Sequence, residues 1–365
     1  MKMINVTKSS LPSYKKYSRK IKKLWKTKHL TNLGFYHNEL EMKLSKYLLV
    51  ENLLLYNNGH SALEFAFEAI MKKGEIITTP FTFSSTTHAI IRTGNTPVFC
   101  DVKYDYTIDE SKIEELITEK TIAIAPVHVY GNICNVDKIS EIAKKYNLMV
   151  IYDSAHVFGT KYKDKGIGTF GDISMFSLHA TKVFHSIEGG ALTFNDNSYK
   201  EMLTSIRNFG QINPENIKYI GGNGKMDEFR AAMGLTLLEI IDSEIGKRKL
   251  VYERYIQNLK HLDGIKLNYV QSDVTSNYAY FPVLFENYKY NRNEIYELLK
   301  INNIISRKYF YPLTSEFSAY KGLFHINETP LAKHLAKNIL CLPLYADLNL
   351  KDVDMICNII KKGVL

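Results

Sequence analysis

Short apolar, β-branched segments alternate with amphipathic helical segments through most of the chain. This order, strand then helix then strand, is typical of an α/β fold in which helices flank a mainly parallel, mixed sheet. The expected strands are Gly74–Thr79, Pro97–Asp101, Thr121–Val129, Leu148–Asp153, Asp172–Ser177 and Ala191–Phe194, and the expected helices are Ser61–Met71, Ser111–Thr118 and Val136–Tyr146. Functional groups in such sheets gather beyond the carboxyl ends of the strands, so we look for a site there.

The pattern changes after residue 243. The elements expected in the remaining part and just before it are helices at Met226–Ile241, Glu244–Leu262, Arg292–Leu299 and Lys351–Lys361 and a strand at Tyr278–Phe285. A chain of 365 residues is long enough for two domains. We therefore expect a large domain of residues 1–243, with a helical segment at its N-terminus, and a smaller α+β domain of residues 244–365.

The formal net charge is +9, and many of the cations lie near the N-terminus. The apolar residues that alternate with them at helical spacing are Leu11, Tyr14, Tyr17, Ile21, Leu24 and Trp25. A basic helix face of this kind is usually a solvated surface, and it also suits an anionic substrate such as a diphosphate. There is no helix-turn-helix or zinc motif, and no apolar run approaches the ~20 residues of a membrane span. We expect neither a nucleic-acid nor a membrane partner.

The cysteines are scattered along the chain, without CxxC or metal-like spacing. They are Cys100, Cys134, Cys341 and Cys357. This pattern favours buried thiols in a reducing compartment over a metal site or a disulfide framework. The lysine-rich start has no apolar signal core after it. We therefore expect a cytoplasmic enzyme with no metal.

Polar residues follow two of the predicted strands. Lys182 lies after one strand end in a segment poor in charge, and a desolvated lysine can bond covalently to an aldehyde cofactor. Ser177 in the same segment could hold a phosphate. Asp153 ends another strand and could pair with a protonated pyridine nitrogen, while His156 could reach a phenolic oxygen. Each residue alone is also compatible with a turn, a helix cap or a structural histidine.

Two loops add further candidates. The turn Asn58-Gly59-His60-Ser61 precedes a helix, whose free N–H groups and dipole attract a phosphate, although a capped helix explains it equally well. Phe83 lies in a hydroxyl-rich loop after a strand. Its ring could lie flat on a planar heterocycle, and simple hydrophobic packing is the alternative.

Along the chain these motifs follow in the order phosphate turn, aromatic residue, aspartate, then Ser-x-His-x-x-Lys and Glu-Gly-Gly. Together they resemble the DegT/StrS family of sugar aminotransferases. The resemblance extends from the segment Leu30–Gly34 to the segment Leu342–Tyr345. It implies a fold-type I enzyme dependent on pyridoxal 5′-phosphate (PLP), which passes through the pyridoxamine 5′-phosphate form. Lys182 matches the catalytic Schiff-base lysine of the family. The cofactor-binding residues that the resemblance implies are Gly59, His60, Ser61, Phe83, Asp153, His156, Ser177, Lys182 and Asn223.

Asn223 matches an asparagine that relatives contribute to the cofactor phosphate of a neighbouring subunit, so the resemblance implies a homodimer with shared active sites. The chain departs from the common pattern at His60, where threonine is usual, at Tyr152, where an acidic residue is usual, and at Lys225. Lys225 and the segment Arg307–Pro312 resemble the branch that makes dTDP-4-amino-4,6-dideoxyglucose.

The implied reaction transfers an amino group from L-glutamate to a dTDP-linked 4-keto-6-deoxy sugar, for surface polysaccharide biosynthesis. Relatives that aminate C3 of keto sugars share most of the same motifs, and a regulatory protein that binds PLP without turnover is a further alternative. The related dehydratases have histidine in place of the lysine, so Lys182 argues against them. His185, Arg307 and Tyr309 could face the sugar nucleotide, although packing or surface roles fit these residues equally well.

Overall fold

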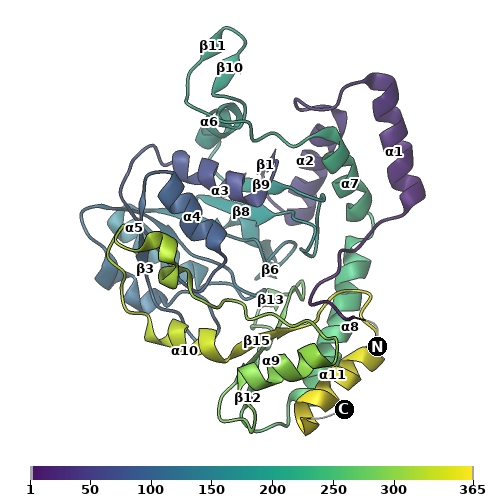
Figure 1. Ribbon diagram of the computed structural model, residues 1–365. Helices are drawn as coiled ribbons and strands as arrows, with labels where there is room; N and C mark the ends of the chain where they lie inside the picture. Colours follow the sequence, from purple (N-terminus) through teal and green to yellow (C-terminus); the bar gives the residue numbers. More distant parts are fainter. Residues whose placement is uncertain (1–2, 364–365) are drawn as a thin grey trace.

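The computed structural model describes residues 3–363 and is built around a seven-stranded sheet of order β1-β9-β8-β5-β4-β2-β3 (Figure 1). The strands are β1 (Asn52–Tyr56), β2 (Glu75–Thr78), β3 (Thr96–Phe99), β4 (Thr121–Ala125), β5 (Met149–Asp153), β8 (Ile173–Ser177) and β9 (Gly190–Phe194). β9 runs antiparallel to both of its neighbours, and the remaining pairs are parallel. The predicted mainly parallel, mixed sheet is confirmed.

Helices cover both faces of this sheet (Figure 1). One face carries α3 (Gly59–Glu68), α4 (Ser84–Arg92) and α6 (Ser198–Ile206), and the other carries α2 (Phe35–Leu48), α5 (Val136–Tyr146) and α7 (Glu228–Leu238). Alternate side chains of each strand enter the two cores, as in β1, where Leu54 packs on one side and Leu53 and Leu55 on the other. The sheet is therefore buried on both faces, which leaves its strand ends as the place for polar groups.

A smaller antiparallel sheet lies toward the C-terminus. It consists of β12 (Ile265–Leu267), β14 (Phe281–Phe285) and β15 (Ile339–Leu342), and it packs with α8 (Ile241–Leu259), α9 (Arg292–Ile301) and α11 (Leu350–Lys362) around a hydrophobic cluster of its own. The Asp101 carboxylate accepts the N–H groups of Leu331 and Ala332 at the start of α10 (Pro330–Asn338), which ties this part to β3. A boundary at residue 243 would fall inside α8, and it stays a prediction.

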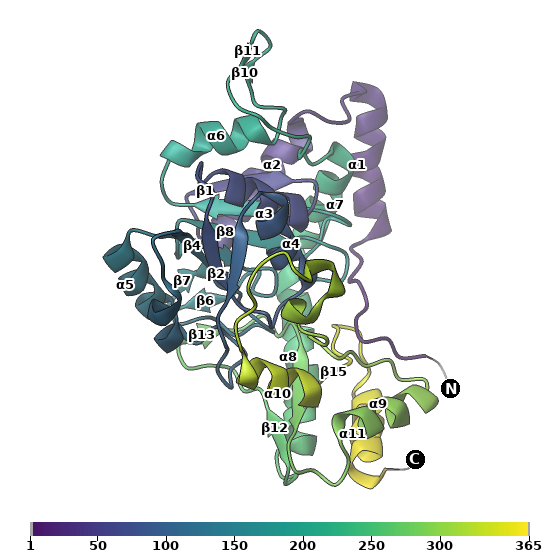
Figure 2. The same cartoon turned by 60° about the vertical axis from the view of Figure 1, so that its left-hand side comes forward.

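Helix α1 (Tyr14–Thr27) lies along α7 at the outer edge of the molecule in both views (Figures 1 and 2). Leu24 is buried, whereas Leu11, Tyr14 and Trp25 are largely exposed, so only part of the predicted apolar stripe packs on the protein. The hairpin β10 (Gln211–Asn213) and β11 (Asn216–Ile217) stands out from the body in both views. The remaining short strands are β6 (Lys161–Tyr162), β7 (Lys165–Gly166) and β13 (Val274–Thr275).

The α-helix predicted at Ser111–Thr118 is wrong. The segment forms two single 3₁₀ turns, Glu110–Lys112 and Glu114–Leu116. It is too short to repay the cost of nucleating an α-helix, and polar side chains hold its backbone instead. The Asp109 carboxylate accepts the Ser111 N–H (3.1 Å).

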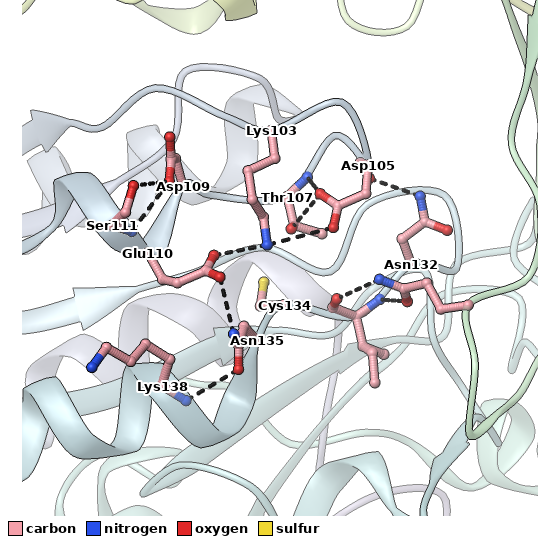
Figure 3. A network of polar contacts seen from close by, with 12 residues as sticks. Lys103, Asp105, Thr107, Asp109, Glu110, Ser111, Asn132, Cys134, Asn135 and Lys138 are labelled. Carbon is pink, nitrogen blue, oxygen red and sulfur yellow. Dashed lines mark hydrogen bonds and ion pairs between the residues drawn. The ribbon is translucent and has the colours of Figure 1, made fainter.

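Ion pairs and amide contacts fix the neighbouring loop (Figure 3). Lys103 lies between Glu110 (2.8 Å) and Asp105 (3.6 Å). Asn135, the residue that caps α5, also donates to Glu110 (3.0 Å). The loop after β3 is therefore bound to the start of α5.

All four cysteines are buried free thiols, as expected. No helix within residues 3–363 combines the length and apolarity needed to cross a membrane.

Candidate active site

A cavity of about 570 Å³ lies at the carboxyl ends of β4, β5 and β8, and its volume is in the usual range for a small-molecule site. The predicted site residues that line it are Gly59, His60, Phe83, Asp153, His156, Ser177, Lys182, Arg307 and Tyr309. They come from segments far apart in the sequence, including the region around the smaller sheet. The structure therefore brings most of the predicted site together in one place.

Lys182 lies in the loop between β8 and β9. Backbone hydrogen bonds close this loop: Leu178 N–H donates to Gly189 (2.8 Å), Ser186 N–H donates to Leu178 (3.0 Å), and Lys182 N–H donates to His179 (2.9 Å). Burial lowers the pKa of Lys182, and the negative charge of Asp153 partly opposes this effect. A lysine with a lowered pKa has more of the neutral amine that attacks an aldehyde.

Asp153 ends β5 and is buried, with 5% of its surface exposed. Its Oδ2 accepts the Thr86 hydroxyl (2.7 Å) and its Oδ1 accepts the Ala155 N–H (3.0 Å). Burial raises the pKa of Asp153, while these two hydrogen bonds and the nearby Lys182 charge lower it, and the net direction is upward. A protonated pyridine nitrogen beside this carboxylate would be the positively charged partner that stabilises its ionised form.

His156 lies in the loop after β5. Its Nδ1 accepts the Tyr130 N–H (3.1 Å), so the hydrogen of the neutral ring is assigned to Nε2. Burial lowers the pKa of His156 well below the ordinary value and keeps the ring neutral. Nε2–H is then available to donate to an oxygen in the cavity, which agrees with the phenolic-oxygen role that the resemblance implies.

The start of α3 provides an anion site at another part of the cavity. Asn58 caps the helix by accepting the Ser61 N–H (2.8 Å), whereas the N–H groups of Gly59 and His60 donate to no group within residues 3–363. A Cβ on Gly59 would lie 3.1 Å from the Cβ of Ser177, so glycine keeps this corner open. Free N–H groups at a helix start suit a phosphate. These residues, with Lys182 and Asp153, fit pyridoxal phosphate.

Aromatic side chains form much of the remaining wall. Phe83 lines the cavity with 59% of its surface exposed, so its ring is free to cover a ligand. Tyr280, Tyr309 and Phe310 also line the cavity. Arg307 lies on the exposed rim, where it donates to the Tyr309 hydroxyl (3.2 Å). The cavity thus has an apolar side, and the Arg307 guanidinium lies at its exposed rim.

Three predicted residues lie outside the cavity lining. His185 is buried, and its ring contacts the Ser10 carbonyl (2.8 Å) and the Ile187 N–H (3.2 Å), so it is engaged in packing and is not available to a substrate. The Ser61 hydroxyl is bonded to the Asn57 side chain and contributes to the helix cap. Asn223 is exposed and accepts a hydrogen bond from Lys225 (2.9 Å).

Sequence reasoning missed two residues that contact the core of the site. Thr86 lies in the hydroxyl-rich segment that follows Phe83, and its hydroxyl holds Asp153. The Tyr280 hydroxyl lies 3.4 Å from Lys182 Nζ, but in the sequence Tyr280 is one aromatic residue of the strand expected at Tyr278–Phe285, without any local motif. Only the hydroxyl-rich start of α4 carried a usable signal.

Comparison with known proteins agrees with this geometry. Residues 14–361 match the model of the DegT/DnrJ/EryC1/StrS aminotransferase family. The chain is 41% identical over 363 residues to a dTDP-4-amino-4,6-dideoxy-D-glucose transaminase of Shigella dysenteriae, with 99% of each chain covered. It is 43% identical over 353 residues to an enzyme of the same name from Escherichia coli, with 95% of each covered.

Solved structures show the same fold. DesI in the presence of its TDP-sugar product superposes with a TM-score of 0.94 at 26% identity, covering 100% of this chain and 94% of that one. PseC of Helicobacter pylori, an aminotransferase involved in the biosynthesis of pseudoaminic acid, gives 0.93 at 28% identity, with 99% of each chain covered. The fold, the lysine-containing cavity and the match along nearly the whole sequence agree, and the chain belongs to the DegT/DnrJ/EryC1/StrS family of PLP-dependent aminotransferases.

Proposed function

We propose that this protein transfers the amino group of L-glutamate to C4 of dTDP-4-keto-6-deoxyglucose, forming dTDP-4-amino-4,6-dideoxyglucose. The observation that carries the transamination is the convergence of Lys182, Asp153 and His156 on one cavity. The choice of sugar rests on the two relatives of 41% and 43% identity, whose names give this product. Such a product would serve as an amino-sugar donor in the biosynthesis of O-antigen or another lipopolysaccharide glycan.

The residues of the chain divide the chemistry between them. When bound, the cofactor supplies an electron sink for the carbon that loses its proton. Lys182 Nζ would accept the proton from the α-carbon of glutamate in the first half-reaction and deliver a proton to C4 of the sugar in the second. Asp153 would hold the ring nitrogen in its protonated form, and His156 Nε2–H would donate to the phenolic oxygen.

Arg307 and Tyr309 are our candidates for contact with the sugar nucleotide. Both line the cavity, and Arg307 keeps its guanidinium on the exposed rim. Guanidinium groups bind phosphate oxygens in pairs, so this position suits a diphosphate that enters from solvent. His185 is not a candidate, because its ring is held by the Ser10 carbonyl and the Ile187 N–H.

We further propose that the protein acts in the cytoplasm as a homodimer with shared active sites. Asn223 supports the dimer, because it is exposed and does not line the cavity of its own subunit. The hairpin β10–β11 that precedes it stands out from the body, in a position from which it could reach a second copy (Figure 2).

The deciding experiment supplies purified protein with glutamate and, in separate reactions, dTDP-4-keto-6-deoxyglucose and its 3-keto isomer. We expect release of 2-oxoglutarate with the 4-keto sugar, and NMR of the product should place nitrogen on C4. Amination confined to C3 would replace the sugar assignment and keep the transaminase. Bound PLP without turnover of either sugar would favour the regulatory alternative.

A further inference from the structure

Tyr280 contacts Lys182 in the cavity, and it belongs to the segment that leads into β14. Lys182 Nζ donates to the Tyr280 hydroxyl at 3.4 Å and lies 5.9 Å from the centre of its ring. Tyr280 lines the cavity and is buried, with 8% of its surface exposed. Within residues 3–363, the Lys182 amine has no hydrogen-bond partner other than this hydroxyl.

Its position relative to the cofactor residues is fixed by a second side chain. Asn277 is buried and its Nδ2 donates to the carbonyls of His156 (3.1 Å) and Phe158 (3.0 Å). The rings of Tyr280 and His156 also pack together, with centroids 4.5 Å apart. The segment before β14 is therefore bound to the loop that carries His156, so the Tyr280 hydroxyl does not depend on a mobile loop for its placement.

The lysine needs such a partner during part of the reaction. While Lys182 is detached from the cofactor, its four-carbon stem regains the rotamer freedom of a flexible side chain. Asp153 is our proposed partner of the ring nitrogen, and no hydrogen bond joins it to the Lys182 amine within residues 3–363. A tyrosine hydroxyl donates and accepts, and it can hold the amine in either protonation state. Burial raises the pKa of Tyr280, which keeps this hydroxyl protonated.

We propose that Tyr280 is a positioning residue of the transamination, whose hydroxyl holds the Lys182 amine in place in the cavity whenever that amine is not bonded to the cofactor. The role concerns the two steps in which the free amine acts: proton transfer and reattachment to the cofactor. It rests on the proposed function only for the identity of the amino donor.

The first test removes the hydroxyl and keeps the ring, in Tyr280→Phe. Single-turnover loss of the visible cofactor band with glutamate should slow roughly ten- to a hundredfold, with an unchanged KM for glutamate. With α-deuterated glutamate the isotope effect should be at least as large as in the wild type, because proton transfer has become the slow step. A loss confined to KM, or a smaller isotope effect, would overturn the proposal.

The second test needs neither donor nor sugar. Cofactor is removed, PLP is added back, and the return of the visible band reports the attack of Lys182 on the aldehyde. We expect Tyr280→Phe to slow this return about tenfold at unchanged final occupancy. A wild type that fails to react with glutamate would count against the proposed donor, whereas this measurement would still decide the role of Tyr280.

Matched variants separate the hydroxyl from the fold. Tyr278→Phe removes a hydroxyl two residues away that does not line the cavity, and it should behave as the wild type in both tests. Tyr280→Leu removes the ring as well. If Tyr280→Phe stays within twofold of the wild type and only Tyr280→Leu is slow, the contribution comes from ring packing and the proposal is wrong.

Discussion

At the scale of single residues, the site combines groups whose pKa values are shifted in ways that suit their proposed roles. Burial lowers the pKa values of Lys182 and His156, which favours the neutral amine and the neutral imidazole. Asp153 is the opposite case, since burial raises its pKa and hydrogen bonds only partly compensate. The carboxylate is therefore the group most dependent on a bound positive charge, and its charge can be tested separately from its shape.

We predict that Asp153→Asn keeps the fold and lowers kcat roughly ten- to a hundredfold. The substitution preserves shape but removes a charge-assisted hydrogen bond to the ring nitrogen, which is worth about 1.5–3 kcal/mol. Steady-state kinetics with saturating substrates measures the effect. The control is Thr86→Val, which removes one hydrogen bond to Asp153 Oδ2 and should cost less. Equal losses in the two variants would mean that the charge of Asp153 is not what matters.

The sequence supplied the residues of the site that belong to local motifs. Lys182, Asp153 and Gly59 follow strand ends or begin a helix, so their place at the edge of a parallel sheet follows from the period of the strands. Tyr280 and Thr86 contact them across long separations in the sequence, and such contacts depend on how the smaller sheet and α4 pack. His185 shows the converse. It lies three residues after Lys182 in the sequence, yet its side chain is buried against Ser10 and does not line the cavity.

At the scale of elements, strands with β-branched residues between helices were predictable, and several other elements were not. β1 was missed because a short apolar run such as Leu53–Leu55 does not distinguish a buried strand from a helix. The segment Ser111–Thr118, expected as a helix, forms two single 3₁₀ turns instead, and the Asp109 side chain caps the first of them. The antiparallel direction of β9 depends on the path of the loop that carries Lys182 between β8 and β9, and the pattern of apolar residues does not predict that path.

The junction of α2 and α7 gives the prediction at this scale. Glu228, in the first turn of α7, accepts the backbone N–H groups of Tyr36 and His37 at the start of α2, each at 2.8 Å. Because the carboxylate is buried, Glu228→Ala would leave both donors unpaired and should lower the free energy of unfolding by about 3 kcal/mol. Urea denaturation measures this.

The control at the opposite end of α7 is Glu239→Ala, which removes the exposed pair with Lys16. We expect a change of less than about 1 kcal/mol, because exposed ion pairs contribute little. If both variants lost equal stability, the cap on α2 would not be the cause.

At the scale of the whole molecule, buried histidines make stability depend on pH. Burial lowers the pKa of His128 to about 3, so the folded protein leaves this ring neutral at a pH where the unfolded chain protonates it. Below pH ~6.5 the unfolded state binds more protons at this site. The free energy of unfolding therefore decreases as the pH is lowered, by up to about 1.4 kcal/mol per pH unit. The effect vanishes above that pH.

His128→Phe tests this sign, because the ring stacks on Tyr152 (centroids 4.7 Å apart) and phenylalanine can keep that contact without titrating. Between pH 7 and pH 5.5, the variant should lose about 1 kcal/mol less stability than the wild type, measured by urea denaturation. An equal loss in His128→Phe and the wild type would contradict the assignment.

The proposed shared sites make a prediction about mixtures of two inactive variants. Lys182→Ala lacks the amine of its own cavity, whereas Asn223→Ala lacks a side chain that we propose to act in the neighbouring cavity. A mixed dimer would then contain one cavity lined by intact Lys182 and an intact Asn223 from the partner. Subunits refolded or exchanged together should recover up to about a quarter of the wild-type activity, since half of the dimers are mixed and each has one complete site.

Lys182→Ala mixed with Asp153→Asn is the control, because it also recombines two impaired subunits. If Asp153 acts within its own subunit, no mixed dimer there has a complete cavity, and activity should not exceed that of the Asp153→Asn parent. Absence of recovery in the first mixture, with dimers demonstrated by sedimentation, would show that Asn223 serves its own subunit.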